Sequence, residues 1–157
     1  MQISERQYTT PLTDKSVRVA IVTALFNHSI TNSLAAAAEG ELKKLGVDAS
    51  RIVKLSVPGA WELPLAAKKI FTEKKADAIV AVGCVIRGDT GHYDIVANES
   101  AQGLTQVALE FTRPVMNAVL TVENTAQAEA RAKNDDTNKG AEAARSLIEL
   151  LNNFAAL

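Results

Sequence analysis

Residues 78–85 read Ala-Ile-Val-Ala-Val-Gly-Cys-Val, and this nearly unbroken apolar run sets the architecture of the chain. A strand that is apolar at every position is covered on both of its faces, which is typical of parallel sheets. A polar loop follows at residues 87–92, and a long segment with apolar residues at helical spacing follows the loop. This order of strand, loop and helix predicts one unit of a parallel α/β sheet.

Similar units lie on both sides of this segment. The other predicted strands are residues 17–25, 51–57 and 115–122, and the predicted helices are a segment through 34–38 that ends at Gly46, then 63–74, 94–111, 125–133 and 140–154. Pro64 fits a helix only in its first turn. Four strands alternating with helices predict a doubly wound, flavodoxin-like parallel sheet with helices on both faces.

Length and composition predict one domain over residues 1–157, with residues 1–12 as an N-terminal arm. The alternating segment 2–10 is either a frayed arm or a strand added to a neighbouring subunit's sheet, and the sequence leaves both open. Net charge is −1 and the 17 basic residues are scattered, so we expect no nucleic-acid partner. The single cysteine excludes an internal disulfide and suits a reducing cytosol. No segment indicates secretion or membrane insertion, so we expect a cytoplasmic protein.

The loops that follow the first three strands carry the unusual residues. They are Phe26-Asn27-His28, the stretch from Pro58 to Glu62, and the stretch from Arg87 to His92. Because the carboxyl ends of parallel strands meet at one edge of the sheet, these loops are expected to converge on a ligand. Glu62 is an isolated carboxylate at such a strand end, and we therefore take it as a candidate ligand-binding residue.

The residue types of the third loop favour anion binding and proton transfer. Gly88, Thr90 and Gly91 lie just before a predicted helix, where backbone N–H groups bind phosphate well, although a plain turn uses the same residue types. Histidine side chains can accept and donate protons at cellular pH, which makes His92 a candidate for proton transfer. The alternative for His92 is a surface or capping side chain.

Four other residues, Phe26, Trp61, Arg131 and Lys139, each have a functional and a structural interpretation. Phe26 and Trp61 are either core residues or rings that stack on a heterocycle. Cys84 lies in an apolar run and is expected to be a small buried hydrophobe without a nucleophilic role. Arg131 and Lys139 bind phosphate or lie on solvated helix faces.

Taken together, these motifs resemble those of the 6,7-dimethyl-8-ribityllumazine synthases of riboflavin biosynthesis over nearly the whole chain. The residues that carry the resemblance are Phe26-Asn27, Val57-Pro58-Gly59-Ala60-Trp61-Glu62-Leu63-Pro64, residues 83–93 (Gly-Cys-Val-Ile-Arg-Gly-Asp-Thr-Gly-His-Tyr), Val119-Leu120-Thr121, Arg131 and Asn138-Lys139-Gly140. The resemblance implies a transferase that condenses 5-amino-6-(D-ribitylamino)uracil with 3,4-dihydroxy-2-butanone 4-phosphate. Phosphate and water are released, and no metal or organic cofactor is required.

The resemblance also implies roles for individual residues. Phe26 stacks on the pyrimidine, and His92 moves protons during imine formation and phosphate elimination. The ribityl chain is held by Ala60, Trp61 and Glu62. Backbone groups of Cys84, Val85 and Ile86 bind the edge of the pyrimidine. The phosphate is held by Asp89, Thr90 and Arg131.

In this family the pocket lies between subunits of a pentamer, and twelve pentamers form a shell in some members. Asn117, Arg131 and Lys139 are then expected to reach the pocket from the neighbouring chain. Riboflavin synthase is a further candidate partner.

Leu25, Asn117 and Ala118 depart from the family pattern, which keeps a weakly active or inactive oligomeric scaffold as an alternative. A flavodoxin-like nucleotide binder is a third interpretation, and it rests on fold analogy alone.

Overall fold

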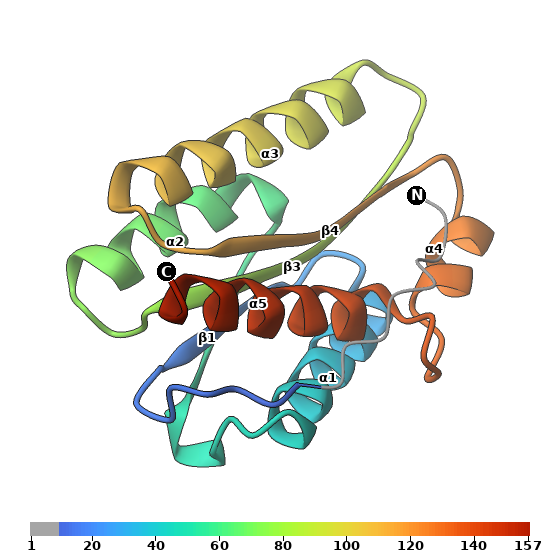
Figure 1. Ribbon diagram of the computed structural model, residues 1–157. Coiled ribbons are helices and arrows are strands. Elements are labelled where there is room, and N and C mark those ends of the chain that lie inside the picture. The colour runs from blue at the N-terminus through green and yellow to red at the C-terminus, as the bar shows by residue number, and fades with distance from the viewer. Residues whose placement is uncertain (1–9) are drawn as a thin grey trace.

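The computed structural model describes residues 10–157, which contain a four-stranded sheet with the strand order β2-β1-β3-β4. All three strand pairs are parallel. The strands are β1 (Val19–Ala24), β2 (Ile52–Val57), β3 (Ala78–Ile86) and β4 (Val115–Val122). The predicted doubly wound sheet is therefore confirmed, and the apolar segment 78–85 is one of its two central strands (Figure 1).

Helices cover both faces of the sheet. One face carries α1 (His28–Lys44), α4 (Thr125–Arg131) and α5 (Lys139–Ala155), and the other carries α2 (Leu63–Thr72) and α3 (His92–Phe111) (Figure 1). Two 3₁₀ turns, Ala49–Arg51 and Ala60–Glu62, flank β2. Pro64 lies in the first turn of α2, as predicted. Gly46 follows the end of α1 with a φ of 96°, which is the left-handed conformation expected of a glycine that stops a helix.

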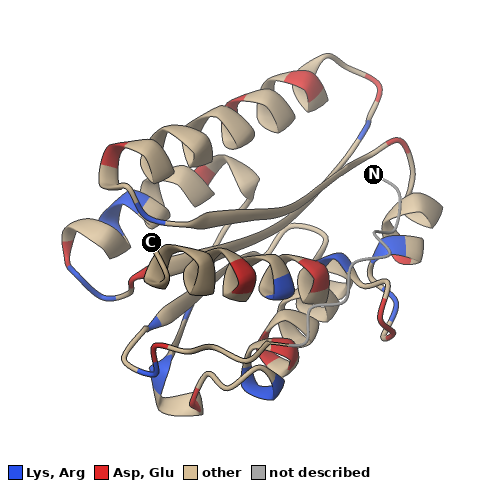
Figure 2. Ribbon diagram, in the orientation of Figure 1, with Lys and Arg blue, Asp and Glu red and all other residues tan. Residues whose placement is uncertain are grey.

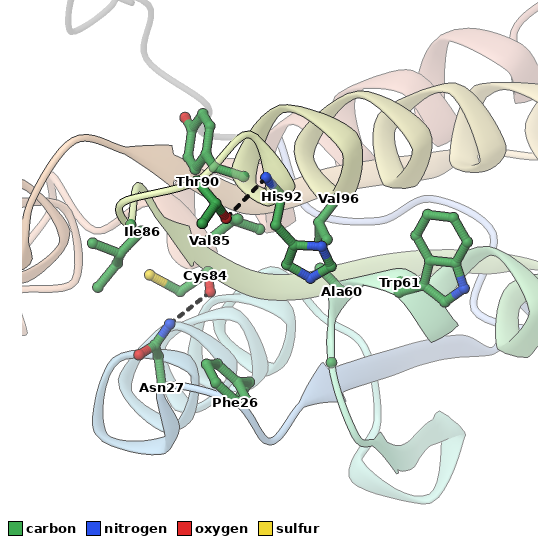
Figure 3. A pocket seen from close by; sticks show the side chains of 13 residues that line it. Phe26, Asn27, Ala60, Trp61, Cys84, Val85, Ile86, Thr90, His92 and Val96 are labelled. Atoms are coloured by element: carbon green, nitrogen blue, oxygen red, sulfur yellow. Dashed lines mark hydrogen bonds between the residues drawn. The ribbon is translucent and has the colours of Figure 1, made fainter.

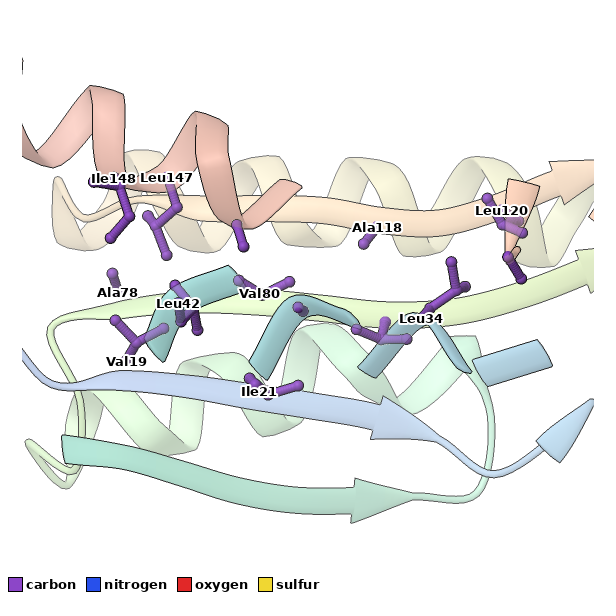
Figure 4. Packing of buried hydrophobic residues seen from close by; sticks show 14 of the residues in the cluster. Val19, Ile21, Leu34, Leu42, Ala78, Val80, Ala118, Leu120, Leu147 and Ile148 are labelled. Carbon is purple, nitrogen blue, oxygen red and sulfur yellow. The ribbon is translucent and has the colours of Figure 1, made fainter. Parts of the chain in front are cut away.

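The alternation of side chains along each strand produces two hydrophobic cores. In β1, Val19 and Ile21 contribute to the cluster under α1 and α5, whereas Ala20 and Val22 contribute to the cluster under α2 and α3. Figure 4 shows the first cluster, where side chains of the sheet meet those of α1 and α5. Burying a Val, Leu or Ile side chain contributes about 1.5–3 kcal/mol to stability. The central strands are therefore held from both sides, and their carboxyl ends form a rigid floor for any site above them.

The described start of the chain is tied to the end of α5 and to the loop after α1. Leu12 is buried, and its N–H group donates a hydrogen bond to the Leu45 carbonyl at 2.8 Å. The Asn152 amide accepts from the Thr13 N–H and donates to the Pro11 carbonyl. The predicted arm over residues 1–12 is thus described only from Thr10 onward, and the segment predicted to fray or to pair with a neighbour lies almost wholly outside the described residues.

Among the described residues, Lys and Arg are interspersed with Asp and Glu over the helices and loops (Figure 2). Within residues 10–157, every helix is too short or too polar to cross a bilayer.

Candidate active site

A cavity of about 360 Å³ opens at the carboxyl ends of β1, β2 and β3. Its walls come from all three loops that the sequence singled out, together with the first turns of α3 (Figure 3). The predicted site residues that line it are Phe26, Ala60, Trp61, Cys84, Val85, Ile86, Thr90 and His92. The predicted convergence of these loops is therefore found in the structure.

The first loop holds an exposed aromatic ring at the edge of the cavity. Backbone N–H groups of Leu25 and Phe26 donate to the carbonyls of Val57 and Pro58, at 2.8 and 3.0 Å, so that the loop follows the end of β2. The Phe26 side chain is 73% exposed. A ring fixed by its backbone but uncovered by protein offers a flat apolar surface for a heterocycle.

The second loop is braced by its own carboxylate. Glu62 Oε2 accepts a hydrogen bond from the Gly59 N–H at 2.9 Å, which closes the 3₁₀ turn Ala60–Glu62. Leu63 is fully buried and anchors the turn to the sheet, whereas Trp61 is exposed. Glu62 Oε1 has no protein partner within residues 10–157, so one carboxylate oxygen is left to accept a ligand hydroxyl.

The third loop presents unpaired backbone donors beside the histidine. Within residues 10–157, no acceptor contacts the N–H groups of residues 88–91. The Thr90 hydroxyl accepts from the His92 N–H at 3.4 Å (Figure 3). Gly91 O accepts from the Asp94 N–H at 3.1 Å. Unpaired N–H groups that precede a 20-residue helix form an anion-binding environment, because the helix dipole adds positive potential at the same end.

Cys84 is buried at the floor of the cavity. Desolvation raises the pKa of its thiol to about 11, so the thiol stays protonated at neutral pH. This agrees with the prediction of a small buried hydrophobe rather than a nucleophile.

The remaining predicted residues do not line this cavity. Glu62 lies in the turn beside it, and Asp89 is exposed in the third loop. Asn117, on β4, lines a separate hollow of about 250 Å³ between α3 and β4. Arg131 is exposed at the end of α4, where it donates to the Gln127 carbonyl at 3.0 Å. Lys139 begins α5 and pairs with Glu142 at 2.6 Å.

Sequence reasoning did not assign a role to Asn27, although it lines the cavity and its amide donates to the Cys84 carbonyl at 2.8 Å. These two residues are 57 positions apart, so no local pattern could reveal the bond. Tyr93 and Val96, on the first turns of α3, also line the cavity without having been assigned a role. The one available sequence signal for Asn27 is its residue type, because Asn tolerates a left-handed backbone conformation better than most residues.

The site combines an exposed ring, backbone groups at the ends of parallel strands, an anion-binding loop and a histidine. These features define an α/β enzyme of flavodoxin-like fold that acts on small molecules.

Comparison with known proteins gives the family. The family model for 6,7-dimethyl-8-ribityllumazine synthase matches residues 16–155, and the chain belongs to this family. Proteins named 6,7-dimethyl-8-ribityllumazine synthase from Polaromonas sp. and Verminephrobacter eiseniae are 44% and 46% identical to it, over 95% and 93% of this chain and 94% and 92% of their own. The protein of that name from Leptothrix cholodnii is 46% identical, over 97% of this chain and 96% of its own. Similarity to named enzymes over almost the whole chain favours an enzyme over an inactive scaffold.

Proposed function

We propose that this protein condenses 5-amino-6-(D-ribitylamino)uracil with 3,4-dihydroxy-2-butanone 4-phosphate to 6,7-dimethyl-8-ribityllumazine, releasing phosphate and water. The observation that carries this proposal is that Phe26, the backbone of residues 84–86, Thr90 and His92 all line one cavity. An aromatic surface, an anion-binding loop and a proton carrier are the groups that joining a pyrimidine to a phosphorylated ketone requires.

The pyrimidine stacks on Phe26, with its polar edge against backbone groups of Cys84, Val85 and Ile86. The ribityl chain extends along the turn formed by Ala60, Trp61 and Glu62, where Glu62 Oε1 accepts hydroxyl hydrogen bonds. The phosphate of the second substrate lies at the loop of residues 88–91, held by the backbone at Asp89 and by the Thr90 hydroxyl.

His92 exchanges protons with the reacting groups. When the pyrimidine amine attacks the ketone, a proton must leave nitrogen and reach the oxygen that departs as water, and phosphate elimination requires a further proton to be removed. An imidazole at the cavity wall can carry out both transfers. The larger effect is placement, because two substrates fixed in contact avoid the entropy cost of a bimolecular encounter.

Asn117, Arg131 and Lys139 complete the site from a neighbouring subunit. One observation supports this assignment: the three residues lie on β4, α4 and α5, and none of them lines the cavity of its own chain. Arg131 then supplies the cation for the phosphate, and a monomer is inactive.

We propose a pentamer, either free or as part of a shell of twelve, and size-exclusion chromatography with light scattering distinguishes these assemblies. A monomer at micromolar concentration with full activity would contradict the shared site. We further propose that residues 1–157 form a single domain, that the protein is cytoplasmic, and that riboflavin synthase is a partner.

The activity is tested by mixing the two substrates with the protein and following the absorbance of the lumazine product. The spontaneous reaction and heat-denatured protein provide the background. Product formation well above this background is expected. A rate equal to the background would favour the scaffold, and binding of flavin mononucleotide without affinity for ribitylpyrimidines would favour a nucleotide binder.

A further inference from the structure

The Arg87 side chain connects three elements around the third loop. Its Nε donates to Glu123 Oε2 at 2.8 Å, just after β4. Its two terminal nitrogens donate to the two carboxylate oxygens of Asp94, both at 3.3 Å, in the first turn of α3. The guanidinium carbon lies 4.1 Å from the centre of the Tyr93 ring. Three of the five N–H donors of the guanidinium, one on each nitrogen, and one face of its plane are thus used within one chain.

These contacts join the two ends of the anion-binding loop. Arg87 directly precedes residues 88–91, and Asp94 and Tyr93 directly follow His92. The backbone of Arg87 is itself fixed, since its N–H donates to the Val122 carbonyl at 2.9 Å. Closing a short loop at both ends restricts the directions in which its unpaired N–H groups point, and preorganised donors bind an anion better than mobile ones.

Two carboxylates also neutralise the charge of Arg87. The guanidinium and its two acidic partners have a combined charge of −1, which does not attract a phosphate. A direct contact between Arg87 and the phosphate would require breaking bonds to Asp94 or Glu123. The arrangement therefore fits a structural clamp better than a ligand.

We infer that Arg87 is a positioning residue, which holds the loop of residues 88–91 and the first turn of α3 in the geometry that binds the phosphate of the substrate. This inference rests on the proposed function for the identity of the anion. Arg87 acts through the loop and does not touch the substrate.

Arg87→Lys tests the clamp, because it keeps the positive charge but loses the bidentate fork and most of the stacking. We expect the KM for the butanone phosphate and the Kd for inorganic phosphate to rise roughly tenfold, while the KM for the pyrimidine changes less than about twofold. Unchanged constants for both phosphate-bearing ligands would overturn the inference.

Glu123→Ala distinguishes two roles for Arg87, a structural clamp of the loop and a direct ligand of the phosphate. Removing a negative charge near an anion site should strengthen phosphate binding if Arg87 were a direct ligand, because Arg87 would be released toward the phosphate. The clamp predicts weaker binding of inorganic phosphate instead. Tighter or unchanged binding in Glu123→Ala would therefore contradict the inference. The matched control is Glu99→Ala on the exposed side of α3, a carboxylate without a partner in the described part of the chain, and it should leave phosphate binding unchanged.

Hydrogen exchange gives a readout that does not depend on catalysis. The Asp94 N–H is bonded to Gly91 O, and the Arg87 N–H to Val122 O, so both should exchange faster in Arg87→Lys than in the wild type. Faster exchange in a protein that forms no lumazine would reject the proposed function and keep the clamp. Normal product formation with unchanged exchange and unchanged phosphate affinity would reject the clamp and keep the function.

Discussion

The amide of Asn27 donates a hydrogen bond to the carbonyl of Cys84 across the floor of the cavity, at 2.8 Å. The bond joins the loop after β1 to the end of β3, and it fixes the residue that follows the exposed ring of Phe26. Asn27 also has a φ of 59°, a left-handed conformation that few residues other than Gly adopt without cost. One side chain thus orders both the aromatic surface and the backbone proposed to contact the pyrimidine.

Asn27→Asp should replace this donor with a carboxylate facing a carbonyl oxygen. We expect the free energy of unfolding at pH 7 to fall by about 1–3 kcal/mol, because two acceptors then meet in a partly buried site. The introduced carboxyl can donate only when protonated, so its pKa should rise in the folded state. The difference from wild type should therefore shrink as the pH falls through this raised pKa, and it should be smallest below about 4, the usual pKa of an unfolded aspartate. Denaturant unfolding of the wild type and of Asn27→Asp at several pH values measures this difference. A difference that does not depend on pH would contradict the hydrogen bond from Asn27 to the Cys84 carbonyl.

His92→Ala should lower kcat by no more than about 10²–10⁴-fold, and activity above background should remain. Placement of the substrates supplies the rest of the acceleration. His28→Ala is the matched control, since His28 is exposed at the start of α1 and does not line the cavity. A wild-type rate in His92→Ala would remove the imidazole from the mechanism.

Arg131→Ala should raise the KM for the butanone phosphate more than the KM for the pyrimidine, because it removes a charge-assisted contact worth about 1.5–3 kcal/mol. Arg131 is exposed, and within residues 10–157 its only bond is to the Gln127 carbonyl, so stability should change little. Steady-state kinetics with each substrate varied in turn gives both constants. An increase confined to the pyrimidine KM would contradict a phosphate role.

Cys84 should react slowly with iodoacetamide in the folded protein. Its thiol pKa is raised to about 11, so at pH 8.5 the folded protein should be alkylated roughly a hundredfold more slowly than the protein in guanidinium chloride. The stability that this thiol contributes is complete below its unfolded pKa and is lost as the pH rises toward 11. Equal alkylation rates in the two states would show that the thiol is neither buried nor shifted.

Gly140→Ala should destabilise the protein, because a Cβ at Gly140 would overlap the Leu34 carbonyl oxygen and force α5 away from α1. We expect a loss of about 1–3 kcal/mol. Gly40 lies in the middle of α1 and is exposed, and a Cβ added there would have nothing within 4 Å. Gly40→Ala should therefore raise the free energy of unfolding by about 0.5–1 kcal/mol. Thermal unfolding of the two variants tests both signs, and a neutral Gly140→Ala would show that the two helices can separate without cost.

Sequence by itself determined the order of the elements and the edge of the sheet that carries the site. Residues 78–85 are apolar on both faces, and only a central parallel strand buries both faces in this way. The loops after β1, β2 and β3 could be placed together for the same reason, because parallel strands end at one edge.

Only the tertiary structure decided which side chains bond to which. The Asn27 bond to Cys84 and the Arg87 contacts with Asp94 and Glu123 depend on side-chain directions between elements, and hydrophobic periodicity carries no information about those directions. The structure likewise places Asn117, Arg131 and Lys139 outside the cavity of their own chain, which residue types and spacing alone could not show. Burial patterns specify which face of an element points inward, whereas hydrogen bonds between distant residues exist only once the elements have packed.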